Sequence, residues 1–132
     1  MFKRGFERLV RLGVLELANY SYWGSPSFAQ PKPKSNQVHF LSDLRNINKQ
    51  LNKKSYPMPK INEILLKLEG FQYATLLDLN MVYYHIRLSE NASTLCMIIL
   101  LWVKYRYKRL PMGVANLPYI FRQKMNDSFH RF

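Results

Sequence analysis

The stretch at residues 71–88, FQYATLLDLNMVYYHIRL, constrains this chain more than any other. Its apolar run at residues 73–77 is typical of a short buried strand, and it ends on the carboxylate of Asp78. A strand that presents one carboxylate at its end is a common way to hold a divalent cation on a rigid element. An Asp-x-Asn sequence is also typical of a turn or a helix cap, so the stretch alone leaves both interpretations open. A second alternating run, which predicts another strand, begins at Tyr83.

The charge balance indicates a polyanionic partner. The chain of 132 residues has 20 Lys and Arg against 8 Asp and Glu, which gives a formal net charge of +12. Nucleic acid is the first candidate partner, and an anionic membrane surface is the second. The alternative is that the chain is a basic part of a longer protein whose acidic complement lies elsewhere.

Length and composition are those of one folded domain. Hydrophobic residues make up 48% of the chain, which argues against disorder for most of it. The longest apolar run is too short for a membrane-spanning helix, and the N-terminus has no continuous apolar segment of the kind found in secretory signals. We therefore expect an intracellular protein with no membrane-spanning segment, and nucleic acid, not a membrane, as its partner. The single cysteine, Cys96, lies in an apolar run and is predicted to be a buried structural thiol.

The first third of the chain predicts a helix and a hairpin. Apolar residues at helical spacing predict a helix over residues 3–18, with Gly13 as its weak point. Residues 27–31 and 38–41 predict two strands of a hairpin, and the turn at residues 31–36 gives this hairpin a basic tip.

Two further helices are predicted later in the chain. One begins near Lys60 and has Gly70 as its C-terminal cap. Its apolar stripe consists of Ile61, Ile64, Leu65 and Leu68. The last helix follows Asn116, which can cap it. Its core-facing residues recur every four positions, at Phe121, Met125 and Phe129.

Between them, residues 95–103 form an uninterrupted apolar run that predicts a buried strand. The next five residues, KYRYK, alternate cations and tyrosines. A strand would therefore present Lys104, Arg106 and Lys108 on one face and the tyrosines on the other. Such a face suits nucleic-acid binding. The alternative is an edge strand that its charges protect from aggregation.

Seven pieces of the chain, taken in series, resemble a known family. In order they are LVRLGVLE, YWGSPSF, HFLSDLRNIN, SYPMPKINEILLKLEGFQYATLLDLN, YYHIRL, KYRYKRLPMG and NLPYIF. Their order and spacing are similar to those of the reverse transcriptases of gypsy-type long-terminal-repeat retrotransposons, and they cover nearly the whole chain. The resemblance implies an α+β fold in which a mixed antiparallel sheet packs on helices. It places the fingers of a right-hand polymerase over about residues 1–70 and part of the palm over about residues 71–132.

The resemblance also implies a reaction, which is RNA- or DNA-templated nucleotidyl transfer from a dNTP onto a primer with two Mg²⁺ ions. It assigns the first of three palm aspartates to Asp78 and a further metal ligand to the backbone carbonyl of Leu79. Tyr83 matches the aromatic residue that excludes a 2′-hydroxyl by sterics.

Further roles around the nucleotide follow from the same resemblance. The matching residues are Lys34, or failing that Lys32, for the triphosphate, and Pro111, Met112 and Gly113 for the loop over the nucleotide and template. Asp43 and Arg45 match a structural pair that holds the fingers hairpin. His39 stands where the family has a triphosphate-binding arginine, and a largely neutral imidazole is a poor substitute for a bidentate cation.

The Tyr-x-Asp-Asp hairpin that supplies the family's other two palm aspartates does not occur in the 132 residues. The aspartates present are Asp43, Asp78 and Asp127, and one palm carboxylate cannot hold two Mg²⁺ ions. We therefore expect this chain to be inactive by itself.

Further departures from the family pattern are Val82 for a glycine, Leu101 and Val103 for the proline and glycine of a turn, Leu117 for a small residue and Arg122 for a glutamine. Two alternatives remain open: a non-catalytic nucleic-acid-binding relic, and an unstable product of a decayed reading frame with an aggregation-prone sheet edge.

Overall fold

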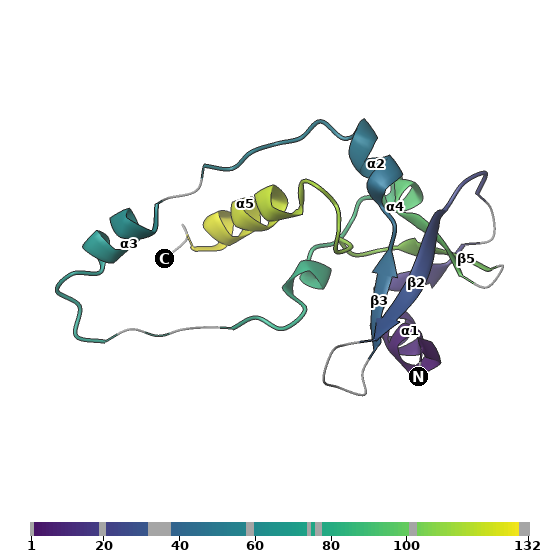
Figure 1. The fold of residues 1–132 in the computed structure, drawn as a ribbon, viewed down its shortest axis with the longest axis horizontal. Helices are drawn as coiled ribbons and strands as arrows, with labels where there is room; N and C mark the ends of the chain where they lie inside the picture. The colour runs from purple at the N-terminus through teal and green to yellow at the C-terminus, as the bar shows by residue number, and fades with distance from the viewer. Residues whose placement is uncertain are drawn as a thin grey trace.

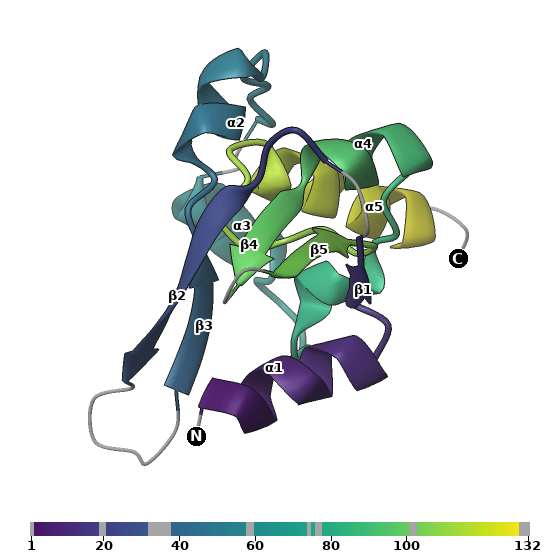
Figure 2. The same cartoon turned by 90° about the vertical axis from the view of Figure 1, so that its right-hand side faces the viewer.

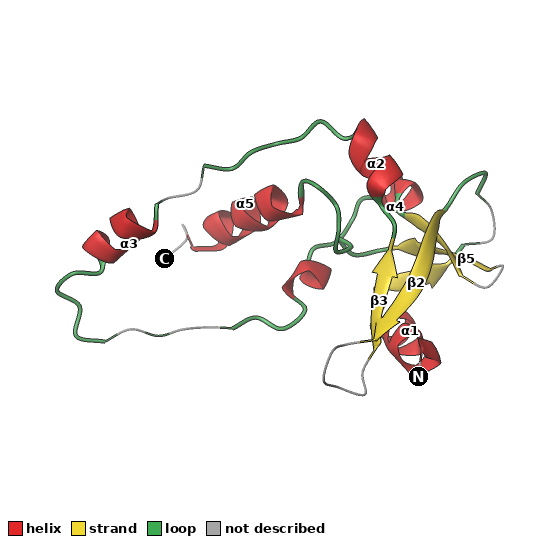
Figure 3. Ribbon diagram, in the orientation of Figure 1, coloured by secondary structure: helices red, strands yellow, loops and turns green. Residues whose placement is uncertain are grey.

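The computed structural model of the chain describes residues 2–18, 21–31, 38–57, 60–73, 75, 78–100 and 103–129. Within these residues the helices are α1 (Phe2–Arg11), α2 (Arg45–Gln50), α3 (Ile61–Lys67), the short 3₁₀ helix η1 (Val82–His85), α4 (Glu90–Leu95) and α5 (Leu117–Phe129). The strands are β1 (Leu15–Leu17), β2 (Ser25–Pro31), β3 (Val38–Ser42), β4 (Met97–Leu100) and β5 (Val103–Tyr107). Figure 3 shows one sheet with α1, α2 and α4 beside it and α3 at a distance from it, so the predicted α+β class is confirmed.

The strands form a mixed sheet in the order β1-β5-β4-β2-β3. β2 pairs with β4 in parallel, and the other neighbouring pairs are antiparallel. In Figures 1 and 2, α1 lies at one end of the sheet, and α2 and α4 lie at the opposite end. The predicted hairpin of β2 and β3 is confirmed, with Ser27 opposite Ser42. Its predicted basic tip lies outside the described residues.

Two apolar clusters hold these elements together. The first lies between α1 and the sheet and contains Leu9, Val14, Leu15, Cys96, Ile98 and Tyr107. The second joins α2, the loop before α5 and the start of α5, and contains Leu44, Ile47, Leu110, Val114 and Leu117. Cys96 is 6% exposed, and burial raises the pKa of its thiol to about 11. The prediction of a buried structural cysteine is therefore confirmed.

Gly13 ends α1 earlier than the sequence analysis predicts. It has a φ of +65°, in the left-handed region that glycine adopts without strain. The N–H of Gly13 donates to the carbonyl of Val10, and the N–H of Val14 donates to that of Leu9, each at 2.9 Å. These are the two bonds of a Schellman motif, which terminates a helix. The predicted helix over residues 3–18 is therefore wrong beyond the end of α1, and β1 follows instead.

The apolar run at residues 95–103 is not the single strand predicted. Ser89 caps α4 by accepting a hydrogen bond from the N–H of Ala92 at 3.3 Å, and the helix extends to Leu95. The run then divides between β4 and the first residue of β5, Val103.

β5 lies between β1 and β4, so the interpretation of this strand as an edge strand is wrong. The predicted alternation of its side chains is confirmed. Tyr107 is 2% exposed and belongs to the first cluster, and Tyr105 packs against that cluster from the same face. The cations that alternate with them in β5, Lys104 and Arg106, take the opposite face.

α3 lies far from the sheet at the end of two long connections, as Figure 1 shows. The predicted helix is confirmed, and Gly70 follows it with a φ of +92°. Three described side chains of its apolar stripe, those of Ile64, Leu65 and Leu68, belong to neither cluster, and Leu65 is 59% exposed. No helix in the described part of the chain has the length and apolar character needed to cross a membrane.

The strand predicted at residues 73–77 is wrong for the residues of this run that the structure describes. Tyr73 and Thr75 lie in no strand, and Tyr73 is 90% exposed. The alternating run from Tyr83 is not a strand either, because η1 occupies its first turn. A strand forms only where a neighbour accepts and donates its backbone hydrogen bonds, and no strand of the sheet pairs with the described residues of this stretch before Arg87.

Candidate functional site

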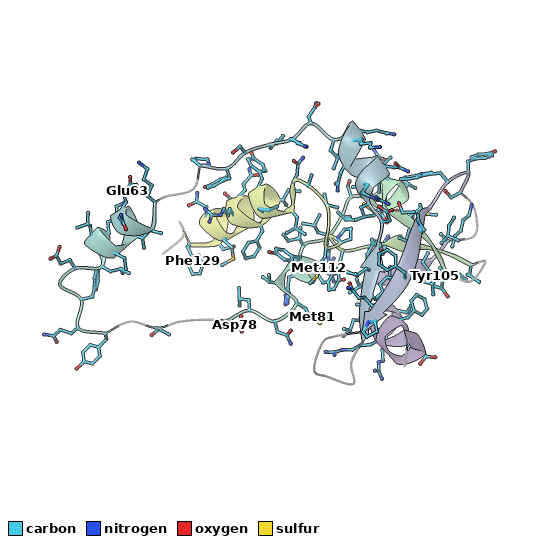
Figure 4. All side chains as sticks on the ribbon, viewed as in Figure 1. Glu63, Asp78, Met81, Tyr105, Met112 and Phe129 are labelled. Carbon is cyan, nitrogen blue, oxygen red and sulfur yellow. The ribbon has the colours of Figure 1, made fainter. Side chains whose placement is uncertain are left out.

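Asp78 lies on the connecting segment that runs alongside α5, as Figure 4 shows. The segment and the helix enclose a cleft of about 780 Å³, which we call the Asp78 cleft. Phe121 and Met125 of α5 form part of its apolar wall, and Asp78 is the only carboxylate among the described residues that line it. The cations Arg87 and Lys124 line the same cleft. An apolar cleft with a few charged groups is the usual form of a ligand site.

A strained turn connects Asp78 to η1. Met81 has φ 51° and ψ 33°, in the left-handed region that side chains with a Cβ disfavour. After this turn, the side chains of two adjacent tyrosines pack against different apolar clusters. Tyr84 packs against the first apolar cluster, and burial raises the pKa of its hydroxyl. Tyr83 packs against the second cluster, and its ring lies against Phe121 of α5.

The loop at residues 111–113 is fixed by a side chain that sequence reasoning missed. The Asn48 amide nitrogen donates to the carbonyl of Gly113 at 2.7 Å, and its amide oxygen accepts from the N–H of Ala115 at 2.8 Å. Gly113 has a φ of +98°, which the loop needs at this point. Asn48 belongs to the HFLSDLRNIN piece, but nothing in its spacing indicates that its side chain reaches this loop.

The Asn116 side chain also links the α2 region to the start of α5. It precedes α5 as predicted, but its side chain bonds the chain that leaves α2 instead of capping the helix. Its amide oxygen accepts from the N–H of Lys54 at 3.0 Å, and its amide nitrogen donates to the carbonyl of Asn52 at 3.0 Å. Asn48 and Asn116 together form two amide clamps between the α2 region and the start of α5.

Asp43 and Arg45 form an ion pair in which the Nη2–Oδ2 distance is 2.6 Å. The backbone N–H of Arg45 also donates to Asp43 Oδ1, at 3.1 Å. These bonds from Arg45 lower the pKa of the Asp43 carboxyl to about 2. The N–H of Asp43 donates to the carbonyl of Pro26 at 2.9 Å, which ties the pair to β2. Its role in holding the hairpin stays a prediction.

Two of the cations assigned to nucleic-acid binding are held in an ion-pair network with Glu16 and Glu90. Arg106 lies 2.6 Å from the Glu16 carboxylate and 2.9 Å from that of Glu90, and Lys108 lies 2.6 Å from Glu90. Lys108 and Arg106 lower the pKa of the Glu90 carboxyl. The two carboxylates compensate the two cations, and a role for Arg106 and Lys108 in nucleic-acid binding stays a prediction.

The remaining assigned residues are placed as follows. Lys104 Nζ donates to the carbonyl of Ser21. Lys34 lies outside the described residues, and His39 lies in β3 with its side chain outside the described part. The structure brings Asp78 and Leu79 into one cleft, whereas Met112 and Gly113 are not among the residues that line it.

Comparison with known proteins decides the family. No family model matches the chain. The Retrovirus-related Pol polyprotein from transposon opus of Drosophila melanogaster is 32% identical to it over 129 residues, which are 95% of this chain and 13% of the polyprotein. The crystal structure of a mutant prototype foamy virus protease-reverse transcriptase has a TM-score of 0.78 and 25% identity to it, covering 96% of this chain and 17% of that one. This chain is a reverse transcriptase-like domain.

The predicted reverse transcriptase family and the predicted fingers-and-palm fold are therefore confirmed, whereas the gypsy type stays a prediction. A foamy viral protease-reverse transcriptase in complex with an RNA/DNA hybrid shares the fold of this reverse transcriptase-like domain, with a TM-score of 0.76 and 19% identity over 99% of this chain and 17% of that one. The domain thus spans about an eighth of the opus polyprotein and about a sixth of the foamy virus chains.

The family implies a divalent metal cofactor, but the described residues of this reverse transcriptase-like domain do not by themselves fit a two-ion site. Among them, no three His, Cys, Asp or Glu side chains gather closely enough to hold a metal ion. The Asp78 cleft offers one carboxylate and the imidazole of His85. Two Mg²⁺ ions need several hard oxygen ligands on fixed positions. Asp78 would supply only one carboxylate to such a site, and its role as a metal ligand stays a prediction.

Proposed function

We propose that this chain is the fingers and first palm part of the reverse transcriptase of a gypsy-type long-terminal-repeat retrotransposon. Residues up to about 70 form the fingers part, and those from about 71 form the palm part. The family reaction is templated nucleotidyl transfer from a dNTP onto a primer. The series of seven sequence pieces, in family order and spacing, supports this assignment.

The observation that carries the proposal is the position of Asp78 on the wall of a ligand-sized cleft. Asp78, with the backbone carbonyl of Leu79, would contribute oxygen ligands to a metal site that other carboxylates complete. Tyr83 would meet the sugar of the incoming nucleotide, and its contact with Phe121 keeps the ring in a fixed orientation. A fixed ring can discriminate against a 2′-hydroxyl by sterics alone. Because one carboxylate does not make a two-ion site, the isolated chain has no polymerase activity.

A second candidate function is nucleic-acid binding without catalysis. The net charge of +12 favours it, because phosphate neutralisation drives such binding. The foamy viral relative that is solved with an RNA/DNA hybrid supports the same class of partner. Binding of this kind weakens steeply as salt rises.

The test is a chimera in which this chain replaces the matching segment of a working retrotransposon reverse transcriptase. We expect templated primer extension by the chimera and a loss of at least about a thousandfold in D78N, since a metal ligand of the reaction is removed. D127N is the matched control and should retain activity, because Asp127 is an exposed residue of α5. Equal activity in D78N and D127N would exclude the role of Asp78.

The second part of the test uses the isolated chain. We expect no primer extension by it in Mg²⁺ or Mn²⁺, together with salt-sensitive binding to an RNA/DNA hybrid. Extension that depends on Asp78 would refute its inactivity. A chimera that is inactive in every form, beside an isolated chain that still binds, would favour the second candidate. A cooperative thermal transition of a soluble monomer would exclude the unstable-product alternative.

A further inference from the structure

Arg87 and Arg109 lie opposite each other in an isolated antiparallel bridge outside the sheet. The N–H of Leu88 donates to the carbonyl of Lys108 at 3.0 Å, and the N–H of Leu110 donates to that of Ile86 at 2.9 Å. These two bonds flank the arginines, so the arginines form a pair of the non-hydrogen-bonded type. In such a pair the side chains share one face and approach each other most closely. Two like charges directly opposite in a bridge repel each other.

Within the described part of the chain, neither arginine has an ion-pair partner. Arg109 makes one long hydrogen bond, from Nη1 to the carbonyl of His85 at 3.4 Å. Both arginines line a groove of about 700 Å³, which we call the arginine groove, and the side chains of Glu16 and Glu90 line it too.

Those two carboxylates do not compensate the arginine pair. Arg106 and Lys108 already hold Glu16 and Glu90 at 2.6 Å each. The four charges of that network sum to zero, which leaves the two guanidinium groups as the excess charge of the groove. Two adjacent, uncompensated guanidinium groups in one groove favour the binding of an anion.

We propose that Arg87 and Arg109 together bind one phosphate of a nucleic-acid backbone. A phosphodiester presents two anionic oxygens, and the planar fork of each guanidinium can donate paired hydrogen bonds to them. The bound phosphate also removes the repulsion within the arginine pair. Arg87 lines both the Asp78 cleft and the arginine groove, so the phosphate site adjoins the cleft and shares this residue with it. The proposal rests on the nucleic-acid binding proposed above and does not need polymerase activity.

The test compares two double variants of the full chain by fluorescence anisotropy with a short RNA/DNA hybrid over a range of salt. R87Q/R109Q removes the arginine pair. K53Q/K67Q is the matched control, because it removes two exposed positive charges from outside the groove. We expect affinity to fall about tenfold or more in R87Q/R109Q and much less in the control. The slope of log K against log salt should become shallower by about one in R87Q/R109Q. Equal losses in the two variants would overturn the proposal, since net charge alone would then explain binding.

A thermal-melting arm separates a binding role from a structural one. Without added anion, R87Q/R109Q should melt at or above the wild-type temperature, because the repulsion between the arginines is gone. The hybrid should raise the melting temperature of the wild type more than that of R87Q/R109Q. A lower melting temperature of R87Q/R109Q in every buffer would mean that the arginines hold the bridge, against the proposal. If inorganic phosphate stabilised the wild type selectively while the hybrid bound both proteins equally, the groove would be a site for free phosphate, and the nucleic-acid assignment would be wrong.

These variants leave Asp78 and Tyr83 unchanged, and the quantity measured is binding. The outcome of this test therefore does not depend on the outcome of the primer-extension experiments.

Discussion

The ring of Tyr83 meets the ring of Phe121 edge to face, with centroids 5.5 Å apart and planes at 80°. This contact joins η1 to α5 across one wall of the Asp78 cleft. It orients the residue that we assign to sugar recognition, although Phe121 lines the cleft and Tyr83 is not among its lining residues.

A double-mutant cycle measures this contact. Y83L and F121L should each destabilise the chain, and the double variant should lose less than their sum. We expect a coupling energy of about 0.5–1.5 kcal/mol from urea unfolding, which is the usual value for an edge-to-face pair. The control cycle pairs Y83L with F129L at the exposed end of α5, where Phe129 is 61% exposed, and should give a coupling near zero. Equal couplings in the two cycles would contradict a specific ring contact.

Met81 provides a test of backbone strain. Its left-handed conformation favours glycine, so M81G should be more stable than M81A by about 1 kcal/mol, although both lose the same packing. At Asn126, inside α5, the order should reverse, with N126A more stable than N126G by about 1 kcal/mol. Denaturant unfolding of the four variants checks both signs. The same order at both positions would show that the turn at Met81 is not left-handed in solution.

The clamp at Asn48 predicts a specific loss of stability. N48A removes a donor to Gly113 and an acceptor for Ala115, and should cost about 1–3 kcal/mol for the two bonds. N46A on the same helix is the control, because Asn46 is exposed, and should cost much less. Hydrogen exchange at Ala115 should quicken in N48A only. Unchanged exchange at that amide would exclude the clamp.

Asp43 should titrate far below an ordinary aspartate. The ion pair and hydrogen bonds from Arg45 lower its pKa from 3.8 to about 2 in the folded chain. A lowered pKa means that this contribution to stability is complete above about pH 4 and is lost as the pH falls toward 2. Carboxyl ¹³C NMR should give a midpoint near 2 in the wild type and a higher midpoint in R45M, which keeps only the backbone hydrogen bond. A wild-type midpoint near 3.8 would contradict the pairing.

Replacing Glu16 and Glu90 should leave Arg106 and Lys108 without their ion-pair partners. E16Q/E90Q should bind an RNA/DNA hybrid more tightly and with a steeper salt dependence than E63Q/E69Q, which makes the same change in net charge on and beside the exposed α3. Anisotropy at several salt concentrations checks this. Identical behaviour of the two variants would mean that Arg106 and Lys108 do not reach nucleic acid even when free.

Local patterns in the sequence predicted the elements that local forces determine. The hairpin of β2 and β3, the alternation along β5 and the helix α3 all follow from the spacing of apolar and polar side chains. The end of α1 was missed because Gly13 can stay in a helix or stop it, and only the bonds back to Val10 and Leu9 decide between the two.

The site was harder to predict, because it depends on neighbours that are distant in the sequence. The strand expected before Asp78 needs a second strand beside it, and apolar spacing alone carries no information about whether one is there. The amide clamp of Asn48 leaves no periodic signal either, since its partners lie more than sixty residues away. The series of family motifs located Asp78, whereas its cleft became visible only in three dimensions.

The pairing of β1 with β5 has a consequence for how this chain is made. Glu16 and Arg106 lie opposite each other in that pair and are 90 residues apart in sequence. During synthesis, the first strand leaves the ribosome long before its partner exists, and its apolar side chains have no sheet to join. Closing so long a loop is slow compared with forming a local hairpin. β1 therefore stays unpaired until β5 has emerged, and a product whose translation stops before Tyr107 lacks the strand against which Leu15 is buried.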